Sequence, residues 1–559
     1  MRDGGRSLAC TVMPTVADVL VRSLVDQDLR TLYCLPGIQL DPFFNAVFDA
    51  GGALRAVHTR HEQGAAYMAL GAALATGRPS AYAVVPGPGV LNTTAALATA
   101  YATSARVLCL SGEIPSRLID KGFGMLHEIP DQIGILRHLT KWAGRIDQPD
   151  DAMRVSAAAF RALRGGRPRP VALEVPPDVL GALAPVDASH ATRRLPDESH
   201  AEPALDHDAI REAARLLAAS RRPLIFVGAG ALDAADHVRR LAERLQAPVV
   251  AYRMGRGVLD DRHPLSLTVP GGHRLWRDAD VVLAIGTRLQ MARMNWGTDE
   301  NLRVIRVEID PAEVDRITTP TIGLVGPAEA VLPALAEALD RVGAVRESRV
   351  DELRMLKADV ARDLAVLEPQ LSYLRAIRAA LPEEGILVDD LTQMSYVARL
   401  AYPVYAPRTY LSSGYQGTLG SGYATALGAQ DARRDVPVVS IAGDGGFMYT
   451  VQELATAVRH AIPVVAVVFN DGAFGNVRRM QQEKHGNRVV ATDLVNPDFV
   501  RLAESFGITG TRVEGPAALR TALERASAAR EPALIEVPVG VMPDPFPFFN
   551  GLPRVRGGK

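Results

Sequence analysis

The residues best suited to chemistry gather between Gly443 and Gly475. Asp444 stands in a Gly-Asp-Gly-Gly turn, and Asn470 begins an Asn-Asp-Gly turn further along. A carboxylate, an amide oxygen and a backbone carbonyl of the second turn are hard oxygen ligands, and they suit a Mg²⁺ ion that keeps its other positions for phosphate oxygens. The glycines allow the backbone to approach such a phosphate closely. The alternative interpretation is an ordinary strand–helix–strand turn with an Asp cap.

Two strands and a helix must position these residues. The runs VPVVSIAG and VVAVVF are rich in β-branched residues, which is typical of strands buried on both faces. Thr450 and Glu453 form a capping-box pattern that predicts a helix beginning at Val451. Parallel strands joined by a helix end at the same edge of a sheet, so Asp444 and Asn470 are predicted at the carboxyl ends of neighbouring strands. Open α/β sheets bind their ligands at that edge.

Composition excludes several classes of protein. The chain has 559 residues, of which 48% are hydrophobic, and a net charge of −1 gives no electrostatic case for nucleic acid or membrane partners. An odd count of three cysteines argues against a disulfide framework. We find no signal-peptide pattern at the start and no run of about 18 apolar residues that could span a bilayer. The predicted location is the cytoplasm.

Three blocks of alternating strand and helix patterns organise the chain. They span residues 15–187, 209–342 and 371–541, and a tail follows at 542–559. This alternation predicts an α/β protein with three doubly wound parallel-sheet domains. The polar segment 188–208 is interpreted as a linker, and the charged segment 346–370 as a linking helix.

Other motifs admit two interpretations each. Glu62 follows a predicted strand and begins an Ala-rich helix, where acidic residues are common for electrostatic reasons alone. A Pro-Gly-Pro-Gly turn precedes Asn92 and exposes backbone amides, although tight packing explains such turns equally well. In the second block, Gly228 and Gly230 form half of a dinucleotide fingerprint, and Asp233 stands at the third glycine position.

Taken together, the motifs resemble a known superfamily. Gly443-Asp444-Gly445, with Asn470 following 26 residues after the aspartate, resembles the thiamine-diphosphate motif of thiamine-dependent decarboxylases and carboligases. The segments TRHEQGAAYMALGAALATGRP and PGPGVLNTTAALATAYATSARVLCLSGEIPSR resemble the first domain of acetolactate synthases. The resemblance runs in order from about residue 15 to 540.

The resemblance implies a division of labour among the domains. The first would bind the aminopyrimidine ring, the third the diphosphate and Mg²⁺, and the central one FAD, ADP or no nucleotide. Because subunits of this family share each cofactor, a homodimer is the expected minimum and a tetramer the larger candidate. Asp444, Asn470 and the Gly472 carbonyl would hold the metal. Residues matching cofactor-contacting positions are Gly37, Pro88, Asn92, Leu391, Thr392, Gly417, Leu419, Gly443, Gly445 and Gly446, with Leu419 as the apolar wedge that bends the cofactor.

Catalytic positions are carried over in the same way. Glu62 would share a proton with the pyrimidine ring. His127 and Glu128 fall near a Phe-Gln pair of acetolactate synthases, and His127 is either a proton relay or a surface-loop residue. Lys141 keeps the family's Thr-Lys pair. Met480 stands where biosynthetic acetolactate synthases carry a substrate-selecting tryptophan.

The leading hypothesis is therefore a thiamine-diphosphate-dependent lyase or transferase. It would decarboxylate a 2-oxo acid such as pyruvate and transfer the acyl carbanion to an acceptor, as acetolactate synthases do. The alternatives are a 2-oxo acid decarboxylase, a 2-hydroxyacyl thioester lyase, or a non-catalytic relative; an intact Glu62, Asp444 and Asn470 argue against the last. Arg478 and Arg479 are interpreted either as carboxylate ligands or as solvated charges. The tail is expected either to cover the active-site mouth or to dock loosely.

Overall fold

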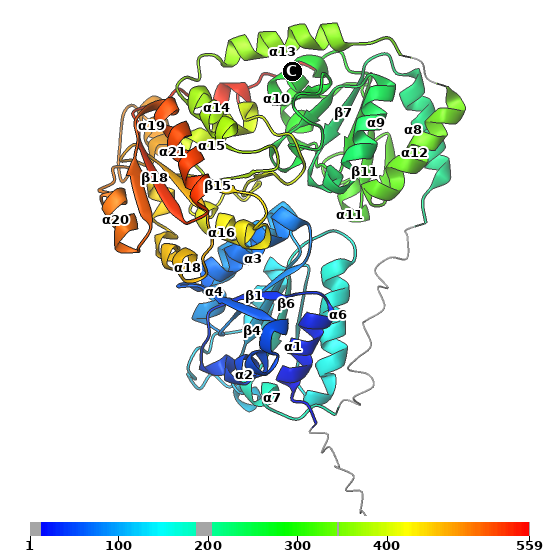
Figure 1. The fold of residues 1–559 in the computed structure, drawn as a ribbon. Helices are drawn as coiled ribbons and strands as arrows, with labels where there is room; N and C mark the ends of the chain where they lie inside the picture. The colour runs from blue at the N-terminus through cyan, green and yellow to red at the C-terminus, as the bar shows by residue number, and fades with distance from the viewer. Residues whose placement is uncertain (1–12, 186–203, 344–345, 558–559) are drawn as a thin grey trace, which may run out of the picture. The chain divides into compact units, whose positions relative to one another are not determined.

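A computed structural model describes residues 13–185, 204–343 and 346–557 of the chain (Figure 1). These residues form two compact units. The first comprises residues 13–69, 79–101 and 106–185, and the second comprises the other described residues. Most of the predicted linker, residues 188–203, lies outside the described residues, and helix α8 begins at His207.

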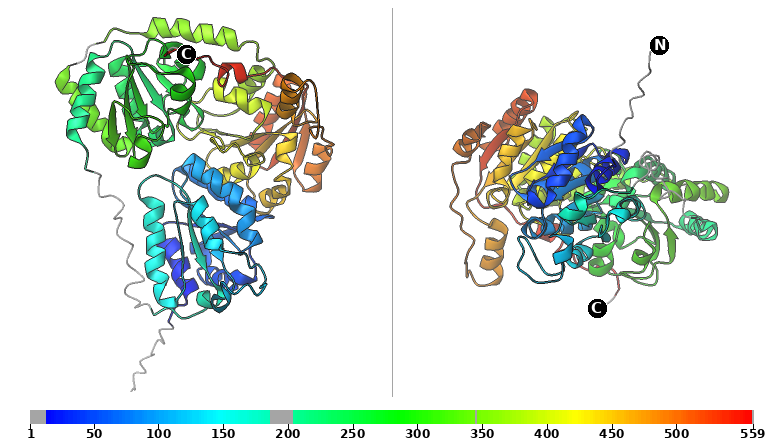
Figure 2. Two further views of the ribbon diagram at one scale, coloured as in Figure 1. Left: turned by 180° about the vertical axis from the view of Figure 1, so that it is seen from behind. Right: turned by 90° about the horizontal axis from the view of Figure 1, so that it is seen from below.

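The first unit contains a six-stranded sheet with helices on both faces (Figures 1 and 2). All of its strand pairs are parallel. In spatial order the strands are β2 Arg55–His58, β1 Thr31–Cys34, β3 Ser80–Val84, β4 Val107–Gly112, β6 Val171–Val175 and β5 Trp142–Arg145. The helices are α1 Val16–Asp26, α2 Asp41–Asp49, α3 Glu62–Thr76, α4 Pro88–Thr103, α5 Gln132–Leu139, α6 Ala152–Arg164 and α7 Pro177–Leu180.

The second unit begins with a second six-stranded parallel sheet. Its strands, in spatial order, are β12 Ile322–Val325, β11 Arg303–Glu308, β10 Val281–Ile285, β7 Pro223–Val227, β8 Val249–Ala251 and β9 Ser266–Leu267. The helices are α8 His207–Ala219, α9 Ala235–Leu245, α10 Val269–Trp276, α11 Pro311–Val314 and α12 Ala328–Val342. Helix α13, Val350–Leu364, follows and confirms the helix predicted in the charged segment.

A third six-stranded parallel sheet completes the second unit. Its strands, in spatial order, are β14 Tyr410–Leu411, β13 Ile386–Asp389, β15 Val438–Gly443, β16 Val465–Asn470, β18 Ala533–Pro538 and β17 Thr509–Arg512. The helices are α14 Gln370–Ala380, α15 Gln393–Ala401, α16 Gly422–Ala432, α17 Asp444–Phe447, α18 Leu454–Arg459, α19 Gly475–Lys484, α20 Phe499–Ser505 and α21 Gly515–Ala529. The predicted α/β class with three doubly wound parallel sheets is confirmed.

Strand order locates where each sheet should bind ligands. The first and third sheets have the same strand order. The second strand in the sequence lies at the sheet edge beside the first strand, and the third strand pairs with the opposite side of the first strand. Their order therefore reverses between β1 and β3 and between β13 and β15, and ligand crevices form at such reversals. The central sheet instead has the order β9-β8-β7-β10-β11-β12, which is that of dinucleotide-binding folds.

Burial explains which strands the sequence predicted. The central strands are continuous apolar runs buried on both faces, as parallel sheets require. Strands β15 and β16, which the sequence analysis predicted, lie inside the third sheet, whereas β5, β9 and β12 each lie at a sheet edge. Edge strands are short or half-exposed, so their sequences lack the buried run. One buried apolar cluster supports the first sheet, and another extends continuously through the second and third sheets.

Two local predictions needed correction. The helix after Asp444 does not begin with a capping box: Thr450 Oγ1 donates to the Gly420 carbonyl, and the Glu453 carboxylate accepts from Thr456. A 3₁₀ turn replaces the first helical turn, and α18 begins at Leu454. Loose docking of the tail is also wrong, because Phe549 and Arg556 are buried.

Candidate active site

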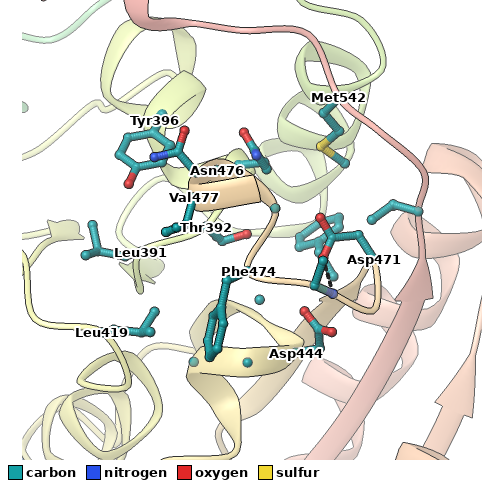
Figure 3. Close-up of a pocket in the computed structure, with 18 residues that line it drawn as sticks. Leu391, Thr392, Tyr396, Leu419, Asp444, Asp471, Phe474, Asn476, Val477 and Met542 are labelled. Carbon is teal, nitrogen blue, oxygen red and sulfur yellow. Dashed lines mark hydrogen bonds between the residues drawn. The ribbon is translucent and has the colours of Figure 1, made fainter. Parts of the chain in front are cut away.

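The third sheet has a pocket at its order reversal. The cavity has a volume of about 160 Å³, and the segments that follow β13, β15 and β16 line it (Figure 3). Figure 3 shows Leu391 and Leu419 on one side and Asp444 and Asp471 on the other. The lining residues are Leu391, Thr392, Gln393, Tyr396, Leu419, Gly443, Asp444, Gly445, Gly446, Phe469, Asp471, Ala473, Phe474, Gly475, Asn476, Val477, Val539 and Met542.

The predicted oxygen ligands meet at the end of this sheet. Strand β15 pairs in parallel with β16, with Gly443 opposite Phe469, so Asp444 and Asn470 follow neighbouring strands. Asp444 is only 2% exposed. The side-chain amide of Asn496 donates to both of them, at 2.6 Å to Asp444 Oδ2 and 3.0 Å to Asn470 Oδ1. The structure therefore brings the two oxygens close enough to share one donor.

Two further contacts shape this corner. Asn470 Nδ2 donates to Glu536 Oε1 at 2.9 Å, so the oxygen of the Asn470 amide is turned toward Asn496. Gly472 has φ +66°, in the region that favours glycine, and its carbonyl accepts from Leu494 N at 2.9 Å. A carbonyl oxygen has two lone pairs, so one remains for a metal ion.

Asp471 adds a second carboxylate beside the first. Burial raises its pKa to about 6, and the nearby negative charge of Asp444 acts in the same direction. Two neighbouring carboxylates and two amide or carbonyl oxygens form a donor set that fits a divalent cation.

Asp390, which the sequence interpretation did not single out, organises the opposite wall. Its buried carboxylate accepts from the backbone N–H groups of Leu391 at 2.7 Å, Gly420 at 3.0 Å and Gly422 at 3.3 Å. Burial raises its pKa to about 6 even though these donors favour the charged form. Asp390 thus ties the turn after β13 to the turn that carries Leu419. Its position directly after a buried strand was the available signal.

Glycines bring the backbone close to this pocket. A Cβ atom added to Gly446 would lie 3.1 Å from Leu419 Cδ1, and one added to Gly445 would lie 2.6 Å from Phe474 Cε1. Gly417 has φ +61°, next to the Leu419 turn. Side chains at the first two positions would press on the pocket walls, so the glycines keep the cradle open.

In the first unit, Glu62 and Asn92 lie together. Glu62 is the first residue of α3, its side chain is 15% exposed, and its Oε2 accepts from Asn92 Nδ2 at 3.0 Å. Helix α4 begins at Pro88 and supplies Asn92. Gly37 packs against the segment that leads into the Pro-Gly turn, because an added Cβ would lie 2.4 Å from Val85 Cγ1.

The Pro-Gly-Pro-Gly turn is fixed by Gln132 and His127. Gly87, at φ +60°, donates its N–H to Gln132 Oε1 at 2.7 Å. A Cβ on Gly87 would lie 2.4 Å from the His127 carbonyl oxygen, so no other residue fits against that backbone. Gln132 is 2% exposed, and its Nε2 donates to Glu174 Oε2 at 2.9 Å.

Behind Gln132 lies a pair of buried carboxyl groups. Burial raises the pKa of Glu174 to about 8, and the charge of Glu113 contributes to the shift. Burial also raises the pKa of Glu113, whereas Arg145, at 3.3 Å from Glu174 Oε1, favours the charged forms. Glu113 directly follows β4 and Glu174 lies within β6, and the sequence interpretation did not single out this pair.

The remaining predicted catalytic residues have varied surroundings. His127 has a buried Nδ1 with no hydrogen-bond partner among the described residues. Glu128 accepts from the backbone of Gly122 and Met125, which shapes its own loop. Lys141 Nζ donates to two backbone carbonyls, at 2.7 Å to Gly165 and 2.9 Å to Arg167, which is a structural use of the ammonium group.

Helix α19 presents Asn476 and Val477 to the pocket, and half-buried Met480 is not among its lining residues. Arg479 is buried and pairs with Asp544 at 2.9 Å, so its interpretation as a solvated charge is wrong. Arg478 remains partly exposed and pairs with Asp493 at 3.0 Å.

In the central sheet, the two glycines of the half fingerprint serve packing. A Cβ on Gly228 would lie 2.3 Å from the Gly286 carbonyl oxygen, and one on Gly230 would lie 2.7 Å from Gly286 Cα. Among the described residues, none of the helices combines the length and hydropathy needed to cross a bilayer.

Comparison with known families accounts for all three sheets. The chain matches the thiamine pyrophosphate enzyme N-terminal TPP binding domain over residues 14–135, the central domain over 210–335 and the C-terminal TPP binding domain over 390–537. It is 34% identical over 504 residues to a probable 2-ketoarginine decarboxylase of Pseudomonas aeruginosa, with 88% of each chain covered.

Acetolactate synthase subunits are similarly related. The probable acetolactate synthase large subunit of Methanocaldococcus jannaschii is 32% identical over 545 residues, covering 93% of this chain and 91% of the relative. The acetolactate synthase isozyme 1 large subunit of Escherichia coli is 30% identical over 540 residues, covering 94% and 93%. With three domain matches in order and relatives spanning almost its whole length, the chain belongs to the thiamine pyrophosphate enzyme family, among its acetolactate synthase-like members.

Proposed function

We propose that the protein is a thiamine-diphosphate- and Mg²⁺-dependent carboligase of acetolactate-synthase type. It would decarboxylate a 2-oxo acid such as pyruvate and transfer the acyl group to an acceptor. The observation that carries this proposal is the pocket at the order reversal of the third sheet, which has oxygen donors at one end and Leu419 at the other. The Glu62–Asn92 pair in the first unit supports the same chemistry.

The donor set fits the diphosphate and its metal. Asp444, Asn470 and the Gly472 carbonyl would hold Mg²⁺, and the concentration of negative charge at Asp444 and Asp471 favours a divalent cation there. The backbone at Leu391, Thr392, Gly445 and Gly446 would face the phosphate oxygens.

Once bound, thiamine diphosphate supplies an electron sink for the carbanion left when a 2-oxo acid loses CO₂. Glu62 would hold a proton at its carboxylate and pass it to and from the pyrimidine ring. Asn92 would fix the direction of that carboxylate through its 3.0 Å hydrogen bond. Leu419 would support the bent shape of the cofactor, and Asp390 would hold the Leu419 turn in place.

A decarboxylase that releases the aldehyde is the second candidate, because one relative is a probable 2-ketoarginine decarboxylase. The two functions differ in the fate of the acyl group. Incubation with pyruvate alone, and then with 2-ketoarginine alone, should be followed by mass spectrometry of the products and by CO₂ release. Acetolactate from pyruvate supports the carboligase, whereas an aldehyde with equimolar CO₂ and no coupled product supports the decarboxylase. Glu62→Gln serves as the inactive control in both assays.

We propose separately that the central domain binds a nucleotide. The dinucleotide-type strand order supports such a ligand, and so does the buried, unpartnered Nε of Arg293 among the described residues. Burial and the neighbouring Arg306 lower the pKa of Arg293, so an anionic group there would be stabilised. FAD and ADP both carry such a group. Denaturing the purified protein and separating the released nucleotides distinguishes them, and a visible flavin spectrum identifies FAD directly.

We also infer a homodimer as the smallest active assembly and a cytoplasmic location. The family resemblance supports the dimer, because its members build each cofactor site from two subunits. Light scattering of the purified protein measures the assembly, and a monomer that retains full activity contradicts it.

A further inference from the structure

Asn496 lies at a position that no motif of the sequence indicated. It belongs to the segment 485–498 between α19 and α20, which is largely exposed. Backbone hydrogen bonds join this segment to the turn after β16, from Leu494 N to the Gly472 carbonyl at 2.9 Å and from Phe474 N to the Thr492 carbonyl at 2.8 Å. This pairing directs the Asn496 side chain inward.

The contacts of Asn496 are with two of the proposed metal ligands. Its Nδ2 lies 2.6 Å from Asp444 Oδ2 and 3.0 Å from Asn470 Oδ1. An amide NH₂ group has two hydrogens, so it donates one to each oxygen. The amide therefore bridges the two side chains and fixes the angle between them.

The bridge leaves both ligands able to bind a cation. A carboxylate has two oxygens, and Asn496 contacts one of those on Asp444. The Asn470 oxygen also accepts the backbone N–H of Gly472 at 3.2 Å, and a cation bound at this oxygen would replace that longer contact. From the other side, Glu536 accepts from Asn470 Nδ2 at 2.9 Å, and Arg512 contacts the second oxygen of Glu536 at 2.8 Å. Hydrogen bonds thus connect Arg512 to Asp444 without a break, through the side chains of Glu536, Asn470 and Asn496.

We propose that Asn496 is a positioning residue: its side-chain amide holds the oxygens of Asp444 and Asn470 in the orientation in which they would bind Mg²⁺. This inference rests on the proposed function, since it assumes that the two residues bind Mg²⁺. Mg²⁺ requires close to ideal octahedral geometry, whereas Ca²⁺ tolerates irregular arrangements. Partners that orient metal ligands typically contribute 10–100-fold to affinity.

The test is a calorimetric titration of the full-length protein, in the presence of thiamine diphosphate, with Mg²⁺ and separately with Ca²⁺. Asn496→Ala is expected to weaken Mg²⁺ binding by about 10–100-fold and Ca²⁺ binding by less, so that discrimination between the ions falls. Asn496→Ser, which keeps one short donor, should give intermediate values. The matched control is Val495→Ala, because Val495 is the neighbouring residue and is fully exposed.

Circular dichroism and melting curves of the metal-free proteins show whether each variant folds. If Asn496→Ala does not fold, the comparison between Asn496→Ser and the wild-type protein decides. Unchanged Mg²⁺ affinity and unchanged selectivity in a folded variant overturn the inference while leaving the proposed function intact. Tighter Mg²⁺ binding also overturns it, because the amide would then compete with the metal. A wild-type protein that binds neither Mg²⁺ nor thiamine diphosphate refutes the proposed function itself, and this inference with it.

Discussion

The Asn92 side-chain amide donates a 3.0 Å hydrogen bond to the Glu62 carboxylate. The two residues come from the starts of different helices, α4 and α3, which follow two different strands of the first sheet. The contact fixes the direction of a carboxylate that keeps 15% of its side chain exposed. A carboxylate held in this way can take up and return a proton without losing its orientation.

Replacing Glu62 by Gln is expected to abolish proton exchange at C2 of bound thiamine diphosphate, because an amide cannot exchange that proton with the pyrimidine ring. Cofactor affinity should stay nearly unchanged, since Gln keeps the size of the side chain and an oxygen for Asn92. Exchange is measured by NMR and affinity by calorimetry. Exchange at the wild-type rate in the variant would contradict a catalytic role.

Replacing Asp444 by Ala is expected to prevent cofactor binding at concentrations that saturate the wild-type protein. Without this carboxylate, Mg²⁺ loses a charged ligand, and the diphosphate then meets uncompensated Asp471. Calorimetry with thiamine diphosphate and Mg²⁺ reports the change. Unchanged affinity would mean that the Gly-Asp-Gly turn is purely structural.

The role of Asp390, which the sequence interpretation missed, can be tested by substitution. Asp390→Ala leaves the N–H groups of Gly420 and Gly422 without their acceptor, and each buried unsatisfied donor costs about 1–3 kcal/mol. The variant should therefore melt at a lower temperature and bind the cofactor more weakly, because the Leu419 turn is no longer held. Glu384→Ala, which removes an exposed carboxylate of the same domain, serves as the control. A stable variant with normal cofactor affinity would rule out this role.

The carboxyl pair behind Gln132 predicts a pH dependence of stability. The pKa of Glu174 is about 8 in the folded protein, above its ordinary value of 4.5, so the folded state holds a proton that the unfolded chain releases between these values. Its contribution to the free energy of unfolding is complete below about pH 4.5. It is lost as the pH rises toward 8, at ~1.4 kcal/mol for each pH unit. The groups facing it are Glu113, Gln132 and Arg145, of which the Gln132 hydrogen bond and the Arg145 charge oppose the rise in pKa.

Calorimetric melting between pH 5.5 and 8.5 checks this expectation. The transition of the wild-type protein should move to lower temperature as the pH rises. In Glu174→Gln, which removes the ionisable group, the shift should be smaller. Equal shifts in the two proteins would assign the pH dependence to other groups.

The acceptor preference is predicted from Met480, which lies on α19 but is not among the residues that line the pocket. The family resemblance places flexible Met480 where biosynthetic acetolactate synthases carry a rigid ring, and flexible side chains discriminate poorly between substrates of similar shape. One methylene is worth only about 1–3 kcal/mol even in a well-formed pocket, so a strong preference for 2-oxobutyrate over pyruvate is not expected. Offering both at equal concentration decides the matter. A tenfold excess of acetohydroxybutyrate over acetolactate, equivalent to about 1.4 kcal/mol, would contradict this prediction and favour a biosynthetic acetolactate synthase.

The sequence by itself determined strands β15 and β16, the turns that end them and the family. Strands β15 and β16 are continuous β-branched runs, and the glycines around Asp444 are local signals that require no knowledge of distant contacts. For the same reason Asp444 and Asn470 could be predicted to meet: parallel strands joined by a helix leave little choice of where they end.

Only the tertiary structure decided the partners of these residues. Asn496 lies 52 residues from Asp444, and Asp390 accepts from Gly420, 30 residues away, so neither contact leaves a periodic trace in the sequence. Edge strands such as β5, β9 and β12 leave a weaker signal in the sequence, because an edge needs less burial than the centre of a sheet. Periodicity records which face of an element is buried, whereas the identity of the group that it meets depends on how distant segments pack.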